Sequence, residues 1–204
     1  SWLTGKESDT AVVFMNGQEK LVGNHDHEHS DIGNFQIYYK GTLAGHGGTY
    51  QGKEGGWGTE HYFNYYRRTI SKNCMTVFDP NEVFLRKRAN KTYANDGGQM
   101  FEENTTNLDE FFSHKDQAST EGVYVGPNEQ TPEFSYLKTN LADAYSDKVT
   151  GYTRSMVALN LFNNDYPMAF ICYDNISSSN KSFKKTWNLQ AVQEPEISGN
   201  QTVI

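Results

Sequence analysis

Short apolar runs recur along the chain, and groups of Gly, Pro, Asn and Asp separate them. Within the runs the apolar residues mostly follow a period of two, and the 13 Tyr and 12 Phe residues suit half-buried pleated surfaces. The pattern predicts strands at residues 10–15, 34–41, 74–80, 122–126, 155–162, 168–174 and 185–192. Helical turns are expected only at residues 107–116 and 139–146.

Many short strands joined by long polar connections are typical of an all-β fold, and we expect a two-layer antiparallel β-sandwich. No repeat of fixed period is visible, so residues 1–204 are expected to form a single domain. The chain begins at Ser1 without an initiator Met or a signal-like segment, and it stops at Ile204 without a terminal-looking tail. We interpret it as part of a longer protein, truncated at both ends.

The charge balance excludes two classes of partner. With 18 basic and 25 acidic side chains the net charge is −7, which disfavours a general nucleic-acid or anionic-membrane surface. The apolar runs are all far shorter than the roughly 20 residues of a membrane span. Cys74 and Cys172 lie in apolar, strand-like surroundings; we expect buried free thiols, with a single bridge or a reactive thiol as the alternatives.

Histidines concentrate in the segment NHDHEHSD, residues 24–31. If this segment is extended, alternation places one set of side chains on the same face: His25, His27, His29 and Asp31. A His-x-His pair can aim two imidazoles at one metal, or one at a metal and the other at a substrate. A third ligand must come from elsewhere, and His46 and His61 are near enough to be hairpin partners. The alternative is a group of hydrated surface histidines.

Several blocks of sequence resemble a known family. The blocks are HDHEHSDIGNFQIYYKGTLAGHGGTYQG, GTEHYFNYYRRTISKNCMTVFDPNEVF, NDGGQ, LADAYSDKVTGYTRSMVALNL and FKKTWNLQAVQEPEISGN. In this order they are similar to the C-terminal β-sandwich of heparinase II/III-type polysaccharide lyases, from about Val12 to the end of the chain. The resemblance implies a periplasmic or secreted protein that acts on an acidic polysaccharide. It also implies an N-terminal α/α toroid in the parent chain, which supplies a catalytic tyrosine and substrate-binding residues.

The resemblance assigns roles within the motif HEHSDIG. In the family, the first His of the pair faces the substrate and the second binds a structural zinc ion, so His27 is the candidate catalytic base or charge neutraliser and His29 the candidate ligand. β-Elimination beside a uronic acid requires removal of the C5 proton, neutralisation of the carboxylate and protonation of the leaving O4. The family register places His25 outside the motif, as a loop histidine.

Three positions depart from the family pattern. His46 stands where the family usually has an aspartate ligand, Lys72 stands where it usually has a histidine, and Gln190 replaces a histidine near the end. His46 can bind zinc as a neutral imidazole, whereas a protonated Lys72 cannot. Two alternatives follow. Either His61 completes a zinc site with His29 and His46, with Asp31 or Glu60 recruited for charge, or the site is lost and Lys72 occupies the vacated space.

The run YYRR adds candidate substrate-binding residues. In an extended strand Tyr65 and Arg67 share one face, and Tyr66 and Arg68 share the other. One such pair could stack on a sugar ring and hold a carboxylate or sulfate, because guanidinium forms a two-point contact with such groups. The alternative is an aromatic residue packed in the sandwich beside an Arg that extends to solvent.

Two classes of function remain open from the sequence. The chain is either the sandwich part of a polysaccharide lyase that cleaves uronic-acid-containing glycans, contributing His27 and a structural zinc, or a non-catalytic carbohydrate-binding or structural module with a degenerate metal site. In the first case we expect the isolated chain to lack activity, because the toroid carries part of the catalytic site.

Overall fold

The protein is an all-β chain made of antiparallel sheets. The computed structural model describes residues 11–19, 28–86, 91–100, 107–109 and 116–203. The strands of the two larger sheets are β1 (Ala11–Met15), β2 (Phe35–Tyr39), β3 (Thr42–Ala44), β7 (Ser119–Gly126), β8 (Phe134–Asn140), β9 (Val149–Asn160) and β10 (Met168–Ser178). The shorter strands are β4 (Met75–Phe78), β5 (Phe84–Arg86), β6 (Lys91–Tyr93), β11 (Lys184–Trp187), β12 (Glu196–Ser198) and β13 (Gln201–Val203).

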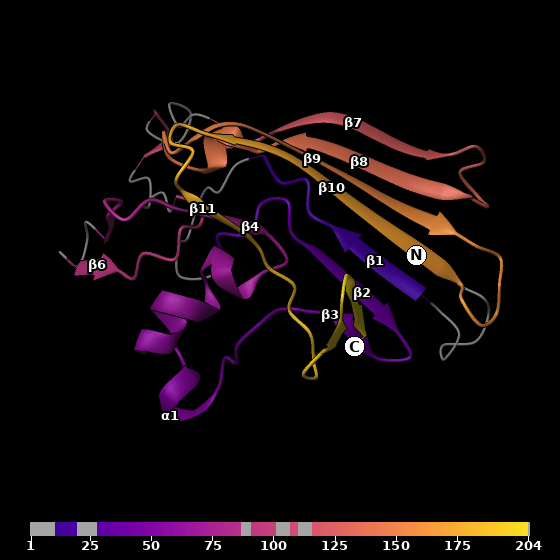
Figure 1. The fold of residues 1–204 in the computed structure, drawn as a ribbon, viewed down its shortest axis with the longest axis horizontal. Coiled ribbons are helices and arrows are strands. Elements are labelled where there is room, and N and C mark those ends of the chain that lie inside the picture. Colours follow the sequence, from indigo (N-terminus) through magenta and orange to yellow (C-terminus); the bar gives the residue numbers. More distant parts are fainter. Residues whose placement is uncertain (1–10, 20–27, 87–90, 101–106, 110–115, 204) are drawn as a thin grey trace.

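Two sheets face each other and enclose a core. The four-stranded sheet has the order β10-β9-β8-β7 and the three-stranded sheet has the order β1-β2-β3, and in Figure 1 the first lies along one side of the second. Side chains from both sheets meet between them: Phe35, Ala44, Leu137 and Met156, with Met15, Ile37, Phe170 and Cys172 packed around them. This arrangement buries alternate residues of the central strand β9, as expected for a sandwich.

A second core lies where strand β4, which pairs with β11, meets the turn before β2. Its buried members include Ile32, Val77, Leu141 and Tyr152. Gly33 follows Ile32 with φ +77°, and a Cβ on it would lie 2.6 Å from Leu141 Cδ1. Only glycine fits this position, since both the backbone conformation and the space exclude a side chain.

The helical segments are short and lie in the connections between strands. Among the described residues they include α1 (Gly52–Gly55), a π-helix η2 (Tyr62–Tyr66), and two 3₁₀ turns, η3 (Thr69–Ser71) and η5 (Ala142–Ala144). In the described part of the chain no helix is long and apolar enough to cross a membrane.

Most of the strand predictions agree with the structure. Strands occur in all seven predicted runs, although β11 ends at Trp187 and the run predicted to 192 does not continue as a strand. The turn predicted at 139–146 contains η5, and of 107–116 the described residues Leu108 and Asp109 are helical. Cys74 and Cys172 are both free thiols, the first buried and the second half-buried.

Two predictions of local structure were wrong. The described part of the histidine segment, Glu28 to Asp31, is not a strand, and it leads into a turn at residues 32–33. The YYRR run is not extended either, because Tyr65 and Tyr66 belong to the π-helix η2 and Arg67 follows its end. The alternation of faces predicted for Tyr65, Tyr66, Arg67 and Arg68 therefore does not apply. Strand β8 was not predicted, since its sequence FSYLKTN mixes polar and apolar residues on both faces.

Candidate functional site

Three segments distant in sequence converge on the candidate site. His29 precedes the turn at 32–33, His46 follows β3, and Lys72 follows η3. Backbone bonds tie the segments together: Ser30 N donates to Arg67 O at 2.9 Å, and Gly47 N donates to Ser71 O at 2.8 Å. Strand β3 and the η2–η3 segment thus fix where the two imidazoles and the amine meet.

The side chain of Asn73 connects the segments that form the site through hydrogen bonds. Asn73 is fully buried. Its Nδ2 donates to Phe35 O at 2.7 Å and to Gly45 O at 3.0 Å, and its Oδ1 accepts from Gln190 N at 2.6 Å. The residues on either side of the site, Gly45 and Lys72, are therefore anchored to strand β2 through one amide side chain.

The two histidines and the lysine form a continuous row of contacts. His46 Nε2 lies 3.0 Å from His29 Nδ1 and 2.6 Å from Lys72 Nζ. Lys72 Nζ also donates to Tyr66 O at 2.6 Å and to Ser71 Oγ at 2.7 Å. The amine thus has three acceptors for the three N–H bonds of an ammonium group. His46 Nε2 has a single lone pair, so when it accepts from the amine it does not also accept a full hydrogen bond from His29 Nδ1.

Burial and nearby positive charge keep both imidazoles neutral at neutral pH. Burial, with the charges of Lys72, His46 and Arg67, lowers the pKa of His29 to about 3. Burial and Lys72 lower the pKa of His46 to about 4, although backbone hydrogen bonds oppose the shift. Neutral imidazoles are the forms that accept protons or bind metals.

Lys72 and Asp31 shift each other's pKa within the site. Burial lowers the pKa of Lys72 to about 7, and the charge of Asp31 opposes this shift. Burial raises the pKa of Asp31 to about 6, and the charge of Lys72 opposes that shift in turn. Each group thus favours the charged form of the other, as expected for opposite charges, while burial opposes both charges.

Aromatic rings cover one side of the histidine pair. The Tyr66 ring lies 5.0 Å from the His29 ring and 4.5 Å from the His46 ring, measured between centroids. Tyr50 packs on Tyr66 at 5.5 Å, and its side chain is 49% exposed. A half-exposed aromatic face therefore lies one ring away from the two imidazoles.

The structure separates His61 from the other two candidate ligands. His61 Nε2 accepts the Thr49 backbone N–H at 3.3 Å, and its ring lies 5.4 Å from the ring of Tyr65. Its partners thus differ from those of His29 and His46, so the set of His29, His46 and His61 is not brought together. His27, the candidate catalytic residue, lies outside the described residues.

The YYRR residues occupy different environments. Tyr65 OH lies 3.5 Å from Gln190 Oε1, and Tyr66 packs on the histidines. Arg67 and Arg68 are 2% and 1% exposed, so neither guanidinium lies on the surface where we expected it to reach a sugar. Arg67 Nε donates to Glu28 O at 2.8 Å, which fixes the segment that leads to His29.

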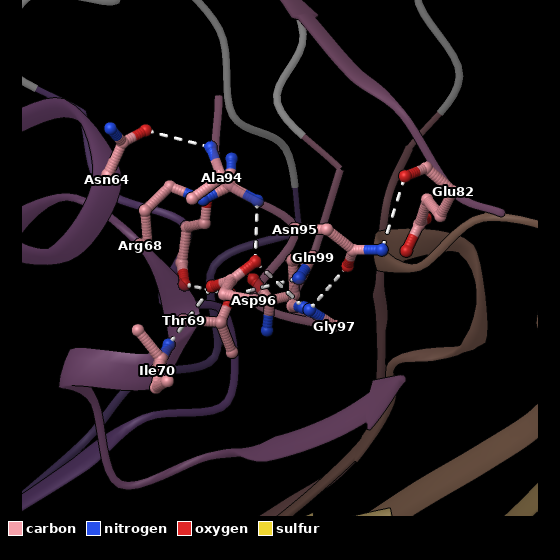
Figure 2. A network of polar contacts seen from close by, with 12 residues as sticks. Asn64, Arg68, Thr69, Ile70, Glu82, Ala94, Asn95, Asp96, Gly97 and Gln99 are labelled. Atoms are coloured by element: carbon pink, nitrogen blue, oxygen red, sulfur yellow. Dashed lines mark hydrogen bonds and ion pairs between the residues drawn. The ribbon is translucent and has the colours of Figure 1, made fainter. Parts of the chain in front are cut away.

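Arg68 belongs to a polar network beside the site, shown in Figure 2. Its Nη2 donates to Asp96 Oδ1 at 2.7 Å, and the Asp96 carboxylate also accepts from the backbone of Ile70 and Gly98. The guanidinium packs on the face of Phe84, with Cζ 4.1 Å from the ring centroid. Asp96 thereby holds the η3 turn that carries the chain to Lys72.

The glycine after His46 packs closely against two side chains. A Cβ on Gly47 would lie 2.5 Å from Gln190 Oε1 and 2.9 Å from Tyr65 OH. Gln190 Nε2 also donates to Ile70 O at 2.9 Å. Gln190 therefore fills the space beside His46 and acts as a packing and hydrogen-bonding residue there.

The resemblance implies a zinc ion near His29 and His46. Among the described residues, no group of three or more His, Cys, Asp or Glu side chains is arranged to hold a metal ion. The third partner of the histidine pair is the amine of Lys72, which donates hydrogen bonds and carries no lone pair when protonated. These residues fit an internal amine better than a metal, because Lys72 Nζ lies against His46, where the second alternative from the sequence expects it.

Three residues that shape the site were not singled out from the sequence. They are Tyr50, Asn73 and Asp96. Asp96 and its neighbours NDGGQ formed one of the family-like blocks, which was a usable signal. Tyr50 and Asn73 also lie in family-like blocks, but nothing in those blocks indicated their roles, which depend on partners that are distant in sequence.

Comparison with models of known protein families found no match, and comparison with curated proteins found none either. The likeness to the heparinase II/III-type sandwich thus stays a prediction from the motifs.

Proposed function

We propose that this chain is the β-sandwich part of a polysaccharide lyase that cleaves uronic-acid-containing glycans by β-elimination. The observation that carries the proposal is the row of contacts His29–His46–Lys72. Its first member, His29, follows His27 by two residues in the sequence. Paired neutral imidazoles beside a buried amine are suited to moving protons and to holding negative charge.

The electrostatics of the site support an anionic substrate. The chain carries a net charge of −7, yet Lys72 and Arg67 both act as positive neighbours of His29. The positive charges of Lys72 and Arg67 attract a uronate carboxylate bound at the site. The attraction grows as negative charge develops on the enolate-like intermediate. The half-exposed ring of Tyr50 offers a face on which a sugar can stack.

The roles follow from the chemistry of the reaction. His27 removes the C5 proton or neutralises the carboxylate, and the contact of His29 with His46 anchors the chain two residues after it. A tyrosine from the α/α toroid of a longer parent chain completes the site and protonates the leaving O4 oxygen. The parent protein acts in the periplasm or outside the cell, where acidic polysaccharides occur.

Two neighbouring histidines provide a matched test in the parent protein. His27→Ala is expected to abolish formation of the unsaturated uronate on acidic glycans, whereas His25→Ala, two residues earlier, is expected to retain it. Product is followed by the ultraviolet absorbance of the new double bond. Undiminished activity in His27→Ala, with correct folding in both variants, would reject the catalytic role.

A second candidate function is favoured by two exposed aromatic residues. Trp57 is 58% exposed and Tyr50 is 49% exposed, and both lie in the stretch that leads from β3 to η2. Such rings are typical of carbohydrate-binding modules without catalytic activity. In this case the isolated chain binds acidic oligosaccharides in calorimetry, and Trp57→Ala weakens binding whereas Tyr166→Ala, at a 72% exposed residue between β9 and β10, does not.

A further inference from the structure

We propose that the amine of Lys72 takes the place of a metal ion in this site, so that the site is held together without zinc. The inference concerns the same site as the proposed function. Its test measures metal content, so either proposal can fail while the other stands.

The contacts of Lys72 Nζ resemble the surroundings of a bound cation. Three acceptors lie around it at 2.6–2.7 Å, namely His46 Nε2, Tyr66 O and Ser71 Oγ. The carboxylate of Asp31 supplies negative charge nearby. An ammonium group with three N–H donors is satisfied in this shell, and the imidazole lone pair that would bind a metal points at the amine instead.

The amine is an integral part of the packing. The Lys72 side chain is 0% exposed, and Nζ lies 5.6 Å from the centroid of the Tyr66 ring. Since a buried amine is costly unless it is hydrogen-bonded, the complete set of acceptors explains why the site tolerates it. A zinc ion bound to His46 Nε2 would lie about 2 Å from it and so would overlap the amine.

The two histidines are close to the spacing that a metal needs. His29 Nδ1 and His46 Nε2 lie 3.0 Å apart. Two nitrogens that each lie about 2 Å from one tetrahedral zinc ion are separated by about 3.3 Å. A small movement therefore lets both nitrogens bind one ion once the amine is removed. A histidine at position 72 can supply the third ligand, because its side chain plus an Nε2–metal bond is about as long as the lysine side chain.

The test compares zinc content in four forms of the chain. Each form is treated with chelator, exposed to zinc, exchanged into metal-free buffer and analysed for zinc by elemental analysis. Wild type and Lys72→Met are expected to hold no stoichiometric zinc. Lys72→His is expected to hold one zinc per chain and to gain melting temperature when zinc is added. The matched control Lys53→His, at an exposed position on α1, is expected to behave as wild type.

Site-specific zinc is the amount lost on replacing His46 by Ala in the same background. One equivalent of such zinc in wild type overturns the inference. Folded Lys72→His without zinc also overturns it, because the amine then does not stand where a metal can bind. If Lys72→His does not fold by circular dichroism, Lys72→Glu offers a carboxylate ligand instead, and the same two outcomes decide.

Discussion

Arg154 on β9 and Asp174 on β10 form a two-point ion pair on the inner face of the four-stranded sheet. Nε lies 2.7 Å from Oδ1 and Nη2 lies 2.9 Å from Oδ2. Arg154 Nη1 then donates to Gly33 O and Asn73 O, both at 2.8 Å. One buried guanidinium therefore joins the sheet to the two segments that carry His29 and Lys72.

Removing one partner of this pair should destabilise the protein strongly. Asp174→Ala leaves a buried, uncompensated guanidinium and is expected to lower the free energy of unfolding by about 3–5 kcal/mol. The matched control is Lys138→Ala in the same sheet, whose pair with Glu121 is 39% and 33% exposed; here little or no loss is expected, because solvent screens an exposed pair. Urea denaturation measures both, and equal losses would contradict the role given to Arg154.

Asn73→Ala should cost more than the loss of an ordinary surface amide. It removes the partners of Phe35 O, Gly45 O and Gln190 N, and a buried backbone group left unpaired costs about 1–3 kcal/mol. We expect a loss of roughly 3 kcal/mol or more. Asn128→Ala, in an exposed turn where the side chain accepts from Gln130 and Thr131, is expected to lose less than about 1 kcal/mol. A comparable loss in both variants would rule out Asn73 as the anchor of the site.

Lys72 makes stability depend on pH in the alkaline range. Its pKa is about 7 in the folded chain and 10.5 in the unfolded chain, so between these values the unfolded chain binds more protons and the free energy of unfolding rises with pH. In Lys72→Met this contribution is absent. Without the charge of Lys72, the folded-state pKa of Asp31 rises further in this variant. The variant therefore loses stability as pH rises.

The difference in unfolding free energy, wild type minus Lys72→Met, is therefore expected to increase from pH 7 to pH 10.5. Urea titrations at several pH values give this difference directly. A constant difference across the range would show that Lys72 is not held in a buried site.

His46 makes stability rise with pH in the same way, but in the acid range. Its pKa is about 4 in the folded chain and 6.5 in the unfolded chain, so below pH 6.5 the unfolded chain takes up the proton first. Stability that is present above pH 6.5 is therefore lost as pH falls towards 4. His46→Gln removes this contribution, and its unfolding free energy is expected to fall less steeply over the same range. Parallel curves for the two proteins would contradict the burial of a neutral imidazole.

Much of the fold could be predicted from the sequence, because the sheets bury alternate residues. Val12 to Met15 and Met156 to Leu159 alternate between faces in this way, and period-two patterns report that burial directly. The run Tyr62–Tyr66 misled because aromatic residues also favour strands, whereas packing of Tyr50, Tyr62 and Tyr66 against one another favours a helical turn here.

The candidate site was predictable only in part. His29 and His46 do meet, as the motif spacing suggested, but the choice between His61 and Lys72 as third partner depends on tertiary structure. Lys72 reaches His46 because the η3 turn lies beside the residues that follow β3. Asp96, 24 residues after Lys72, holds that turn. Contacts of this kind leave no local pattern in the sequence.

The most direct test of the account is a crystal structure of the wild-type chain grown with zinc, with anomalous scattering recorded at the zinc absorption edge. We predict Lys72 Nζ within hydrogen-bond distance of His46 Nε2 and no anomalous peak at the pair. A peak about 2 Å from both His29 and His46, with the Lys72 side chain turned away, would contradict the central claim that a lysine amine holds this site in place of a metal.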